Sequence, residues 1–245
     1  MTVASTELQH HAAAWFAGWS ALRSYQVTSG PGYRAALRLD RGMEWEYFSC
    51  DPSAATFTEV AAEAAATSAQ HTLCIIGPNV HKYVKMAHAA GLGMVSTSEH
   101  FMVCSMENQD TQEPFLSDPE VSLVIKRLGG RHNASICQER FSATIMHGET
   151  LLASGNVGIY GDYAVFDSLQ TRQPHRRAGY GLFVMRTLAA RAKAHPVTTG
   201  VVLASTDGQR LYRKLGWRSL GTMTVLAPRA RLAEIAQAWQ RSPGP

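Results

Sequence analysis

Between a strand-like segment at 164–171 and a helix-like segment at 182–194 lies the run Arg176-Arg177-Ala178-Gly179-Tyr180-Gly181. A strand, a turn with two glycines one residue apart and a helix form a common arrangement for binding phosphate. Glycine has no Cβ, so the backbone of such a turn can approach an anion closely. The first turn of a helix adds free N–H groups and the positive end of the helix dipole. The run therefore predicts a cradle for a pyrophosphate group at the start of the helix.

Positive charge gathers at the same turn. Residues 171–193 hold six Arg/Lys and no acidic residue, whereas the net charge of the whole chain is +4. Residues 1–115 carry 6 Lys/Arg against 11 Asp/Glu, and residues 116–245 carry 17 against 8. A basic half could bind a nucleic acid, but the clustering of positive charge at the turn favours an anionic cofactor. No zinc finger, aromatic RNA-binding signature or basic zipper appears in the sequence, and we expect no nucleic-acid partner.

A second motif follows the helix. An apolar strand at 200–204 leads into a short helix that ends in Leu211-Tyr212-Arg213-Lys214-Leu215-Gly216-Trp217, and another strand follows at 222–227. This order of motifs resembles the GNAT superfamily of acyl-CoA-dependent N-acetyltransferases over roughly 122–228. The resemblance implies an α/β fold with a mixed, mostly antiparallel twisted sheet, flanked by helices and splayed at a cofactor cleft. It also implies acetyl-CoA as the acyl donor.

The N-terminal half repeats this order of elements. We expect a helix at 1–22, then strands and helices at 44–50, 54–67, 72–76, 80–90 and 101–105, with Gly91 ending the second helix of the repeat. The polar segment 107–120 is typical of a linker. The pattern favours a degenerate repeat, as in tandem GNAT proteins, with a degenerate GNAT-like or accessory domain at 1–115 and a catalytic acyl-CoA-binding domain at 116–245.

The first copy has lost the cradle. Its strand-to-helix turn reads Asp51-Pro52-Ser53, with neither glycine nor arginine. Proline removes an N–H, and Asp51 would repel phosphate. We therefore predict one cofactor site per chain, in the second half.

The remaining elements are predicted to be strands and one helix. The strands span 121–128, 134–139, 142–147, 150–160 and 163–171, with a hairpin turn at 161–162. A helix at 229–241 carries an apolar stripe suited to the core or to contact with a second copy in a homodimer.

The resemblance assigns the cofactor residues. Backbone groups of Leu169 and Thr171 would pair with the pantetheine arm. Ser205 stands where the family often has Asn, so its hydroxyl could contact pantetheine or simply cap a helix. The side chains of Arg172 and Arg177 could reach CoA phosphates or lie in solvent. The pyrophosphate would bind to the backbone N–H groups of Arg176, Arg177, Ala178, Gly179, Tyr180 and Gly181.

Tyr212 occupies the position that, in many GNAT enzymes, protonates the leaving thiolate. A phenol with an ordinary pKa of about 10 holds a proton at neutral pH; the alternative is a tyrosine that only packs in the helix. For the base, Asp167 is the best placed, since it lies on the strand entering the cradle, but it could equally be paired with an arginine. Glu149 and His147 are further candidates.

We therefore expect transfer of an acetyl group from acetyl-CoA to a primary amine of a small molecule, by direct attack in a ternary complex and without a metal. A covalent intermediate is disfavoured because no cysteine lies near the motifs in the sequence. The four cysteines are widely spaced, which suits buried thiols in a reducing cytoplasm. No segment has the length of a membrane span. The alternative is an acyl-CoA-binding sensor without turnover. The identity of the acceptor and the length of the acyl group stay open.

Overall fold

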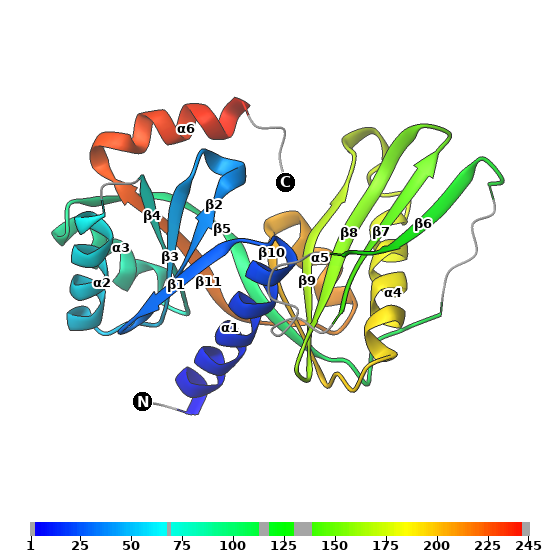
Figure 1. The fold of residues 1–245 in the computed structure, drawn as a ribbon, viewed down its shortest axis with the longest axis horizontal. Coiled ribbons are helices and arrows are strands. Elements are labelled where there is room, and N and C mark those ends of the chain that lie inside the picture. The colour runs from blue at the N-terminus through cyan, green and yellow to red at the C-terminus, as the bar shows by residue number, and fades with distance from the viewer. Residues whose placement is uncertain (1–2, 68–69, 113–117, 130–138, 242–245) are drawn as a thin grey trace. The chain divides into compact units, whose positions relative to one another are not determined.

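A computed structural model describes residues 3–67, 70–112, 118–129 and 139–241 (Figure 1). The chain forms two compact units. Unit 1 comprises residues 1–13, 25–101 and 219–245, and unit 2 comprises residues 14–24 and 102–218. This division differs from the predicted boundary at 115/116, because β11 (Arg218–Pro228) returns to unit 1 and the end of β5 (Leu92–Ser105) enters unit 2.

Unit 1 contains a mixed sheet with the strand order β1-β2-β3-β4-β11-β5. The β3–β4 pair is parallel, while the β1–β2, β2–β3 and β4–β11 pairs are antiparallel. The strands are β1 (Gln26–Gly30), β2 (Tyr33–Arg38), β3 (Glu44–Cys50) and β4 (His71–Gly77), besides β11 and β5. The helices are α2 (Ala54–Ala66), α3 (Val80–Ala89) and α6 (Leu232–Arg241), with short 3-10 turns η1 (Leu39–Arg41) and η3 (Arg229–Arg231).

The core of unit 1 lies between this sheet and helices α2 and α3. Strand residues such as Tyr47 and Leu73 pack against Phe57 of α2 and Tyr83 of α3. Burial of each large apolar side chain contributes roughly 1.5–3 kcal/mol. The Ser53 hydroxyl caps α2 by accepting the Thr56 N–H at 3.1 Å.

Unit 2 contains the strand order β5-β10-β9-β8-β7-β6. Strands β6 to β9 are antiparallel to their neighbours, and β10 is parallel to β9. The strands are β6 (Val121–Arg127), β7 (Glu139–His147), β8 (Thr150–Tyr160), β9 (Tyr163–Thr171) and β10 (Thr199–Ser205). The helices are α4 (Tyr180–Lys193) and α5 (Thr206–Lys214), with the 3-10 turn η2 (Gln173–His175) and the second part of α1 (Val3–Leu22).

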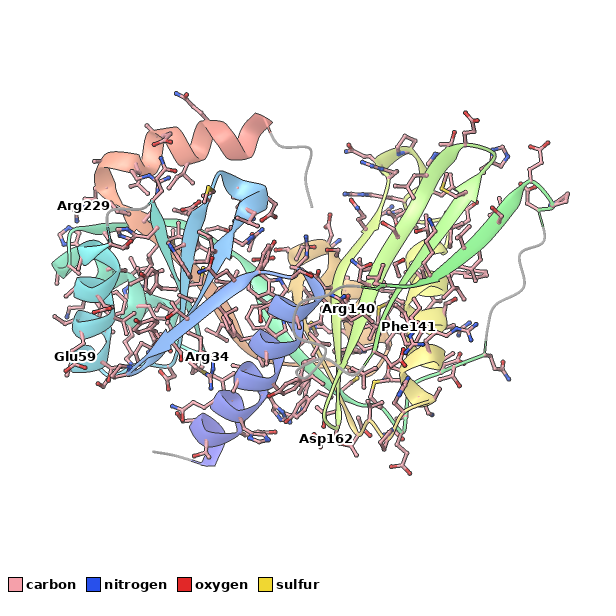
Figure 2. The ribbon with its side chains drawn as sticks, in the orientation of Figure 1. Arg34, Glu59, Arg140, Phe141, Asp162 and Arg229 are labelled. Carbon is pink, nitrogen blue, oxygen red and sulfur yellow. The ribbon has the colours of Figure 1, made fainter. Side chains whose placement is uncertain are left out.

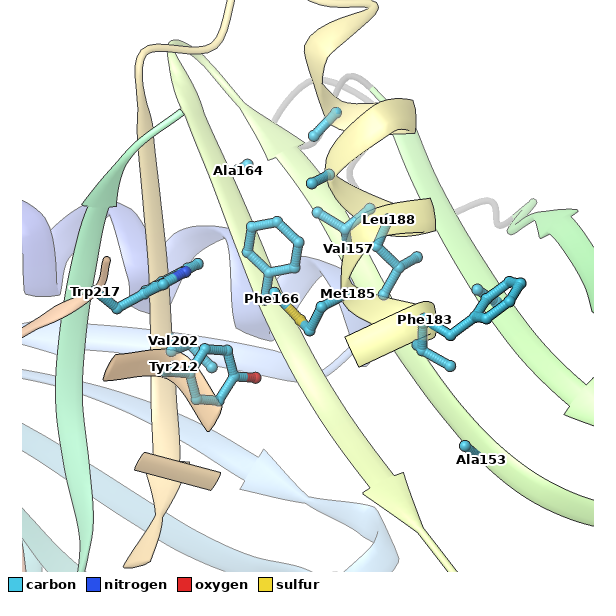
Figure 3. Close-up of a cluster of buried hydrophobic side chains, with 14 of the residues drawn as sticks. Ala153, Val157, Ala164, Phe166, Phe183, Met185, Leu188, Val202, Tyr212 and Trp217 are labelled. Carbon is cyan, nitrogen blue, oxygen red and sulfur yellow. The ribbon is translucent and has the colours of Figure 1, made fainter. Parts of the chain in front are cut away.

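Helices pack closely on the sheet of unit 2. A Cβ on Gly18 of α1 would lie 2.4 Å from Val165 Cγ2, so α1 reaches β9 only because residue 18 is glycine. Helix α4 lies over β7, β8 and β9 (Figure 1). Its residues Phe183, Met185 and Leu188 join Phe166 of β9 in one buried cluster (Figure 3).

The predicted fold is confirmed: a mixed, mostly antiparallel α/β sheet flanked by helices. The order β3-α2-β4-α3-β5 recurs as β9-α4-β10-α5-β11. In both copies the second helix ends at a glycine with positive φ, Gly91 at 73° and Gly216 at 82°. The sequence did not predict β1, β2 or the first part of β5. Most of the strand predicted at 134–139 lies outside the described residues, although Glu139 begins β7.

Candidate active site

Parallel strands β9 and β10 separate where their pairing ends. Four residue pairs join them, the last being Phe166 opposite Val202. Although β9 continues to Thr171 and β10 to Ser205, these fully described segments form no further pairs with each other. Backbone groups beyond Phe166 and Val202 can therefore bind a ligand between the strands.

A bulge lies at the start of the unpaired part of β9. The register against β8 shifts between Ser154 and Asn156, so that Ser168 and Leu169 stand against Gly155. Ser168 has φ of 55°, in the left-handed region. Bulges bend a strand and redirect the residues that follow.

Beyond the bulge, alternate residues of β9 turn their backbone groups toward the gap. The Arg172 N–H donates to the Leu152 C=O of β8 at 2.8 Å. Successive residues of a strand direct their backbone groups to opposite edges, so Thr171 and Leu169 face away from β8. These are the two residues predicted to bind the pantetheine arm, and that contact stays a prediction.

The turn before α4 presents a row of unpaired amides. Gly179 is the N-cap residue with φ of 87°, and Arg177 has φ of 66°. Phe183 is the first residue whose N–H binds within the helix, to the Gly179 C=O at 3.0 Å. Among the described residues, nothing accepts a hydrogen bond from the N–H groups of residues 177–182. A Cβ on Gly179 would have no atom within 4 Å, so this side of the turn is open. Such a row of amides at a helix N-terminus suits a pyrophosphate.

The basic side chains of the turn differ in their surroundings. The Arg176 Nε donates to the Thr171 C=O at 3.3 Å, and its Nη1 lies 3.4 Å from Asp207 Oδ2 of α5. Arg172 and Arg177 are exposed, and neither side chain has a partner in the described part of the chain. They fit either alternative, contact with a phosphate or a position in solvent. Ala178 and Tyr180 contribute backbone to the row, as does Gly181.

Ser205 caps α5. Its hydroxyl accepts the Gly208 N–H at 3.2 Å. Of the two predicted roles, the cap is therefore observed, and contact with pantetheine stays a prediction.

Tyr212 is buried in unit 2, with 2% of its surface exposed. Its ring packs edge-on against Trp217, which contacts Phe166 in the same way (Figure 3). No described residue forms a hydrogen bond with its hydroxyl. Burial raises the pKa of Tyr212 well above its ordinary value. Smaller contributions in the same direction come from the charge of Asp167 and then from Cys104. The phenol is therefore protonated at physiological pH, both if Tyr212 only packs in the core and if it donates its proton to a thiolate.

Asp167 forms an ion pair with Arg23, a residue that follows α1. Arg23 Nε lies 2.6 Å from Asp167 Oδ2, and Nη2 lies 3.3 Å from Oδ1. The charge of Asp167 raises the pKa of Tyr212, so the two predicted catalytic residues lie within electrostatic reach of each other. The ion pair with Arg23 also agrees with the alternative interpretation, in which Asp167 is a carboxylate paired with an arginine.

The other base candidates lie at the β7–β8 hairpin. His147 Nε2 is 3.0 Å from Glu120 Oε2, and Glu149 is exposed in the turn. Neither lies on β9 or β10, and neither contributes to the pKa shift of Tyr212.

Cys104, which is distant from the motifs in the sequence, lies against the paired part of β10 in the fold. A Cβ on Gly200 of β10 would lie 2.7 Å from Cys104 Sγ. Burial raises the pKa of Cys104 to about 12, so it is a neutral thiol and not a nucleophilic thiolate. Cys50 has its pKa raised to about 12, and burial also raises the pKa of Cys74. Cys137 lies outside the described residues.

Unit 1 contains the counterpart of the gap, and there it is closed. Strands β3 and β4 stay paired from Trp45 opposite His71 to Cys50 opposite Ile76. The Asp51 N–H then donates to the Ile76 C=O at 2.9 Å. The two strands of this parallel pair therefore do not separate.

Side chains fill the turn that follows β3. Asp51 has φ of 40°, and its Oδ1 accepts hydrogen bonds from the Tyr83 hydroxyl at 2.7 Å and Lys82 Nζ at 3.0 Å. The Tyr83 hydroxyl lies against Gly77, where a Cβ would be 2.0 Å away. An internal carboxylate thus occupies the turn, which favours the prediction of one cofactor site per chain.

Sequence reasoning missed two residues that support the site. Arg23 is separated from Asp167 by 144 positions. Gln109, in the predicted linker, is buried with 8% of its surface exposed. Its Oε1 accepts the Trp217 Nε1–H at 3.2 Å, and its Nε2 donates to the Leu215 C=O at 3.1 Å. Polar residues in a polar segment give no signal that distinguishes them before the fold is known.

No protein family model and no curated protein sequence matches the chain. Several solved structures do match it. A GCN5-related N-acetyltransferase from Kribbella flavida has a TM-score of 0.64 at 16% identity, over 91% of this chain and 98% of that one. A GCN5-related N-acetyltransferase from Sphaerobacter thermophilus has a TM-score of 0.55 at 11% identity, over 80% and 76%.

The chain therefore has a GNAT-like fold. A tandem GNAT protein from the clavulanic acid biosynthesis pathway also matches, with a TM-score of 0.54 at 12% identity over 79% of this chain and 77% of that one. This likeness agrees with the repeated order of elements in the two halves.

Two further features are absent from the part of the chain that the structure describes. The described residues contain no helix long and apolar enough to cross a membrane. They also bring together no group of three or more His, Cys, Asp or Glu side chains that could hold a metal ion.

Proposed function

We propose that the chain is an N-acetyltransferase that moves an acetyl group from acetyl-CoA to a primary amine of a small molecule. One observation carries this proposal: the row of unpaired amides at 177–182 lies directly after the strand that diverges from β10. One segment of the chain therefore offers first a strand edge, at the end of β9, that suits an extended arm. It then offers a helix N-terminus, at the start of α4, that suits a pyrophosphate. The two similar structures from Kribbella flavida and Sphaerobacter thermophilus are described as N-acetyltransferases, which agrees with acyl transfer.

The chain's own groups would hold the donor in three places. The free edge of Leu169 and Thr171 suits the amides of a pantetheine arm, although the Thr171 carbonyl already accepts from Arg176. The amides of residues 177–182 suit a pyrophosphate. Arg172 and Arg177, both exposed beside the turn, suit further phosphate groups.

When bound, acetyl-CoA supplies a thioester: an amine attacks its carbonyl carbon, the new C–N bond replaces the C–S bond, and the nitrogen loses a proton while the sulfur gains one. Tyr212 is suited to give the sulfur its proton, because its raised pKa keeps the phenol protonated and its hydroxyl has no partner among the described residues. Cys104, held as a neutral thiol, is unsuited to carry the acetyl group, which favours direct attack.

Asp167 is the base candidate whose charge reaches Tyr212. Both of its oxygens accept hydrogen bonds from Arg23, so a proton from the amine would have to compete with a guanidinium. We therefore assign Asp167 the role of a fixed, compensated charge beside the acid. The amine would then have to arrive neutral or lose its proton to solvent.

The same ion pair favours a second candidate, an acyl-CoA-binding sensor without turnover. A site with a donor cradle and no free base would bind the donor and not consume it. The two functions make the same prediction for binding and opposite predictions for thiol release.

Calorimetric titration with acetyl-CoA, followed by a thiol-release assay across a panel of amines, tests both. We expect saturable binding of one acetyl-CoA per chain and release of thiol with at least one small primary amine. Binding without release across the panel would favour the sensor. Absence of binding would refute both.

A further inference from the structure

Within unit 2, one arginine of β7 binds both the last turn of α1 and the segment that follows it. Arg140 of β7, labelled in Figure 2, has 9% of its surface exposed. Its Nη1 donates to the Ala21 C=O at 2.8 Å and to the Ser24 Oγ at 3.2 Å. A charged donor buried against the last carbonyls of a helix fixes the position of that helix end. Arg23, which lies between Ala21 and Ser24, therefore starts from a defined backbone position.

From there the Arg23 side chain contacts the first two residues of β9 beyond its last pair with β10. It binds both oxygens of Asp167, and its Nη2 also donates to the Ser168 Oγ. The Ser168 hydroxyl in turn donates to Asp167 Oδ2 at 3.0 Å. Each of the three side chains thus binds the other two.

This closed set of contacts holds a strained residue. Ser168 has φ of 55°, a conformation that costs a non-glycine residue on the order of 1–3 kcal/mol and persists only when its surroundings impose it. The bulge at Ser168 determines which way Leu169 and Thr171 turn their backbone groups. Loss of the contacts would allow β9 to adopt other conformations beyond Phe166.

We propose that Arg23 is a positioning residue for the acyl donor: by binding Asp167 and Ser168 together, it holds the bulge of β9 so that Leu169 and Thr171 face the gap beside β10. The proposal rests on the proposed function for its ligand, and on the contacts of Arg23 for its mechanism. A residue that directly follows α1, far from the motifs in the sequence, thereby sets the geometry of the donor site.

Hydrogen exchange of the protein without ligand, compared between the wild type and Arg23→Gln, tests the mechanism. We expect amide exchange at residues 167–172 to become about tenfold faster in R23Q, because this end of β9 opens locally. Arg23→Lys keeps one charged donor and should fall between the two. Lys126→Gln, which removes an exposed charge from β6, should leave exchange at 167–172 unchanged.

The affinity for acetyl-CoA, measured by calorimetry on the same proteins, tests the link to the ligand. We expect Kd to rise about tenfold in R23Q, to rise less in R23K and to stay unchanged in K126Q. Asp167→Asn should weaken binding similarly, and adding R23Q to D167N should cause little further loss, because the two residues act through one contact.

The outcomes separate this inference from the proposed function. Unchanged exchange at 167–172 in R23Q would overturn the inference, and so would faster exchange spread evenly over all of unit 2, which would mean general destabilisation. Local loosening with unchanged Kd would also overturn it. If the wild type binds no acetyl-CoA while R23Q still loosens 167–172 alone, the proposed function fails and the hold of Arg23 on β9 stands.

Discussion

The indole of Trp217 lies edge-on to the phenol ring of Tyr212, with the ring centroids 5.1 Å apart and an interplanar angle of 63°. Gln109 fixes that indole through its Nε1–H and binds the Leu215 C=O at the end of α5. A residue from the segment before β6 therefore determines how the ring of the proposed acid packs.

Replacement of Tyr212 by Phe keeps the ring packing and removes the proposed proton donor. We expect kcat to fall about a hundredfold, in the range of general acid catalysis, with an unchanged Kd for acetyl-CoA. Tyr160→Phe, at the end of β8, is the control and should leave kcat unchanged. Normal turnover by Y212F would remove Tyr212 from the mechanism and leave it a packing residue.

Gln109→Leu should destabilise the protein, because it leaves the Trp217 Nε1–H and the Leu215 C=O without their partner in a buried place. We expect the free energy of unfolding to fall by about 2 kcal/mol, measured by urea denaturation. Gln112→Leu, at an exposed position of the same segment, should change it little. Equal effects of Q109L and Q112L would show that the hydrogen bonds of Gln109 do not hold Trp217.

Gly179 and Gly161 form a matched pair for testing the cradle. Both have positive φ, 87° and 57°, and a Cβ on either would meet nothing within 4 Å. Gly179→Asp places a carboxylate beside the row of amides, whereas Gly161→Asp places one in the β8–β9 hairpin. We expect G179D to weaken acetyl-CoA binding about a hundredfold and G161D to leave it unchanged, with similar melting temperatures. Equal affinities in the two variants would contradict the location of the site.

Stability should fall at alkaline pH. Burial raises the pKa of Cys104 from an ordinary 9.0 to about 12, so above pH 9 the unfolded chain releases this proton before the folded one. The contribution of the buried, protonated Cys104 to the free energy of unfolding is complete below about pH 9. It is lost between about pH 9 and 12, at up to about 1.4 kcal/mol per pH unit. Urea denaturation at several pH values, under reducing conditions, should give a shallower decline for Cys104→Ala. The same decline in C104A and the wild type would contradict the assignment.

Asp51→Asn tests the closed counterpart in unit 1. Asn tolerates the positive φ of residue 51 but is a weaker acceptor for Lys82 and Tyr83. We expect the free energy of unfolding to fall by about 1 kcal/mol and the affinity for acetyl-CoA to stay the same. A clear loss of affinity in D51N would mean that this turn takes part in donor binding.

The sequence predicted those parts of the fold whose signal is local. Apolar periodicity and the glycines at 179 and 216 identified the elements from β9 to β11, and Gly91 correctly marked the end of α3. Strand β1 was missed because most of its residues are exposed and only Val27 is a large apolar residue, and the first part of β5 because it carries Ser and Thr in place of an apolar run. Their strand structure comes from pairing with neighbours, which no local pattern encodes.

For the candidate site, local signals in the sequence place the residues on their elements, while the roles of these residues stay predictions. The row of amides follows from the placement of Gly179, and the neighbourhood of Asp167 and Tyr212 follows from the order of the motifs. The partner of Asp167 could not be predicted, because Arg23 reaches it only through the packing of α1 on β9 at Gly18. Whether a carboxylate is free or paired depends on such contacts between distant segments.

The position of β11 has a consequence for synthesis. In unit 1 this strand lies between β4 and β5, yet it is made after all of unit 2. A ribosome working at 5–20 residues per second would complete β11 on the order of ten seconds after β5. Until then, β4 and the first part of β5 lack the strand that separates them, and each presents unpaired backbone groups open to association with other chains. The unit that begins the chain is thus the last to be completed, and a nascent protein halted within unit 2 would need a chaperone's protection at its N-terminal sheet.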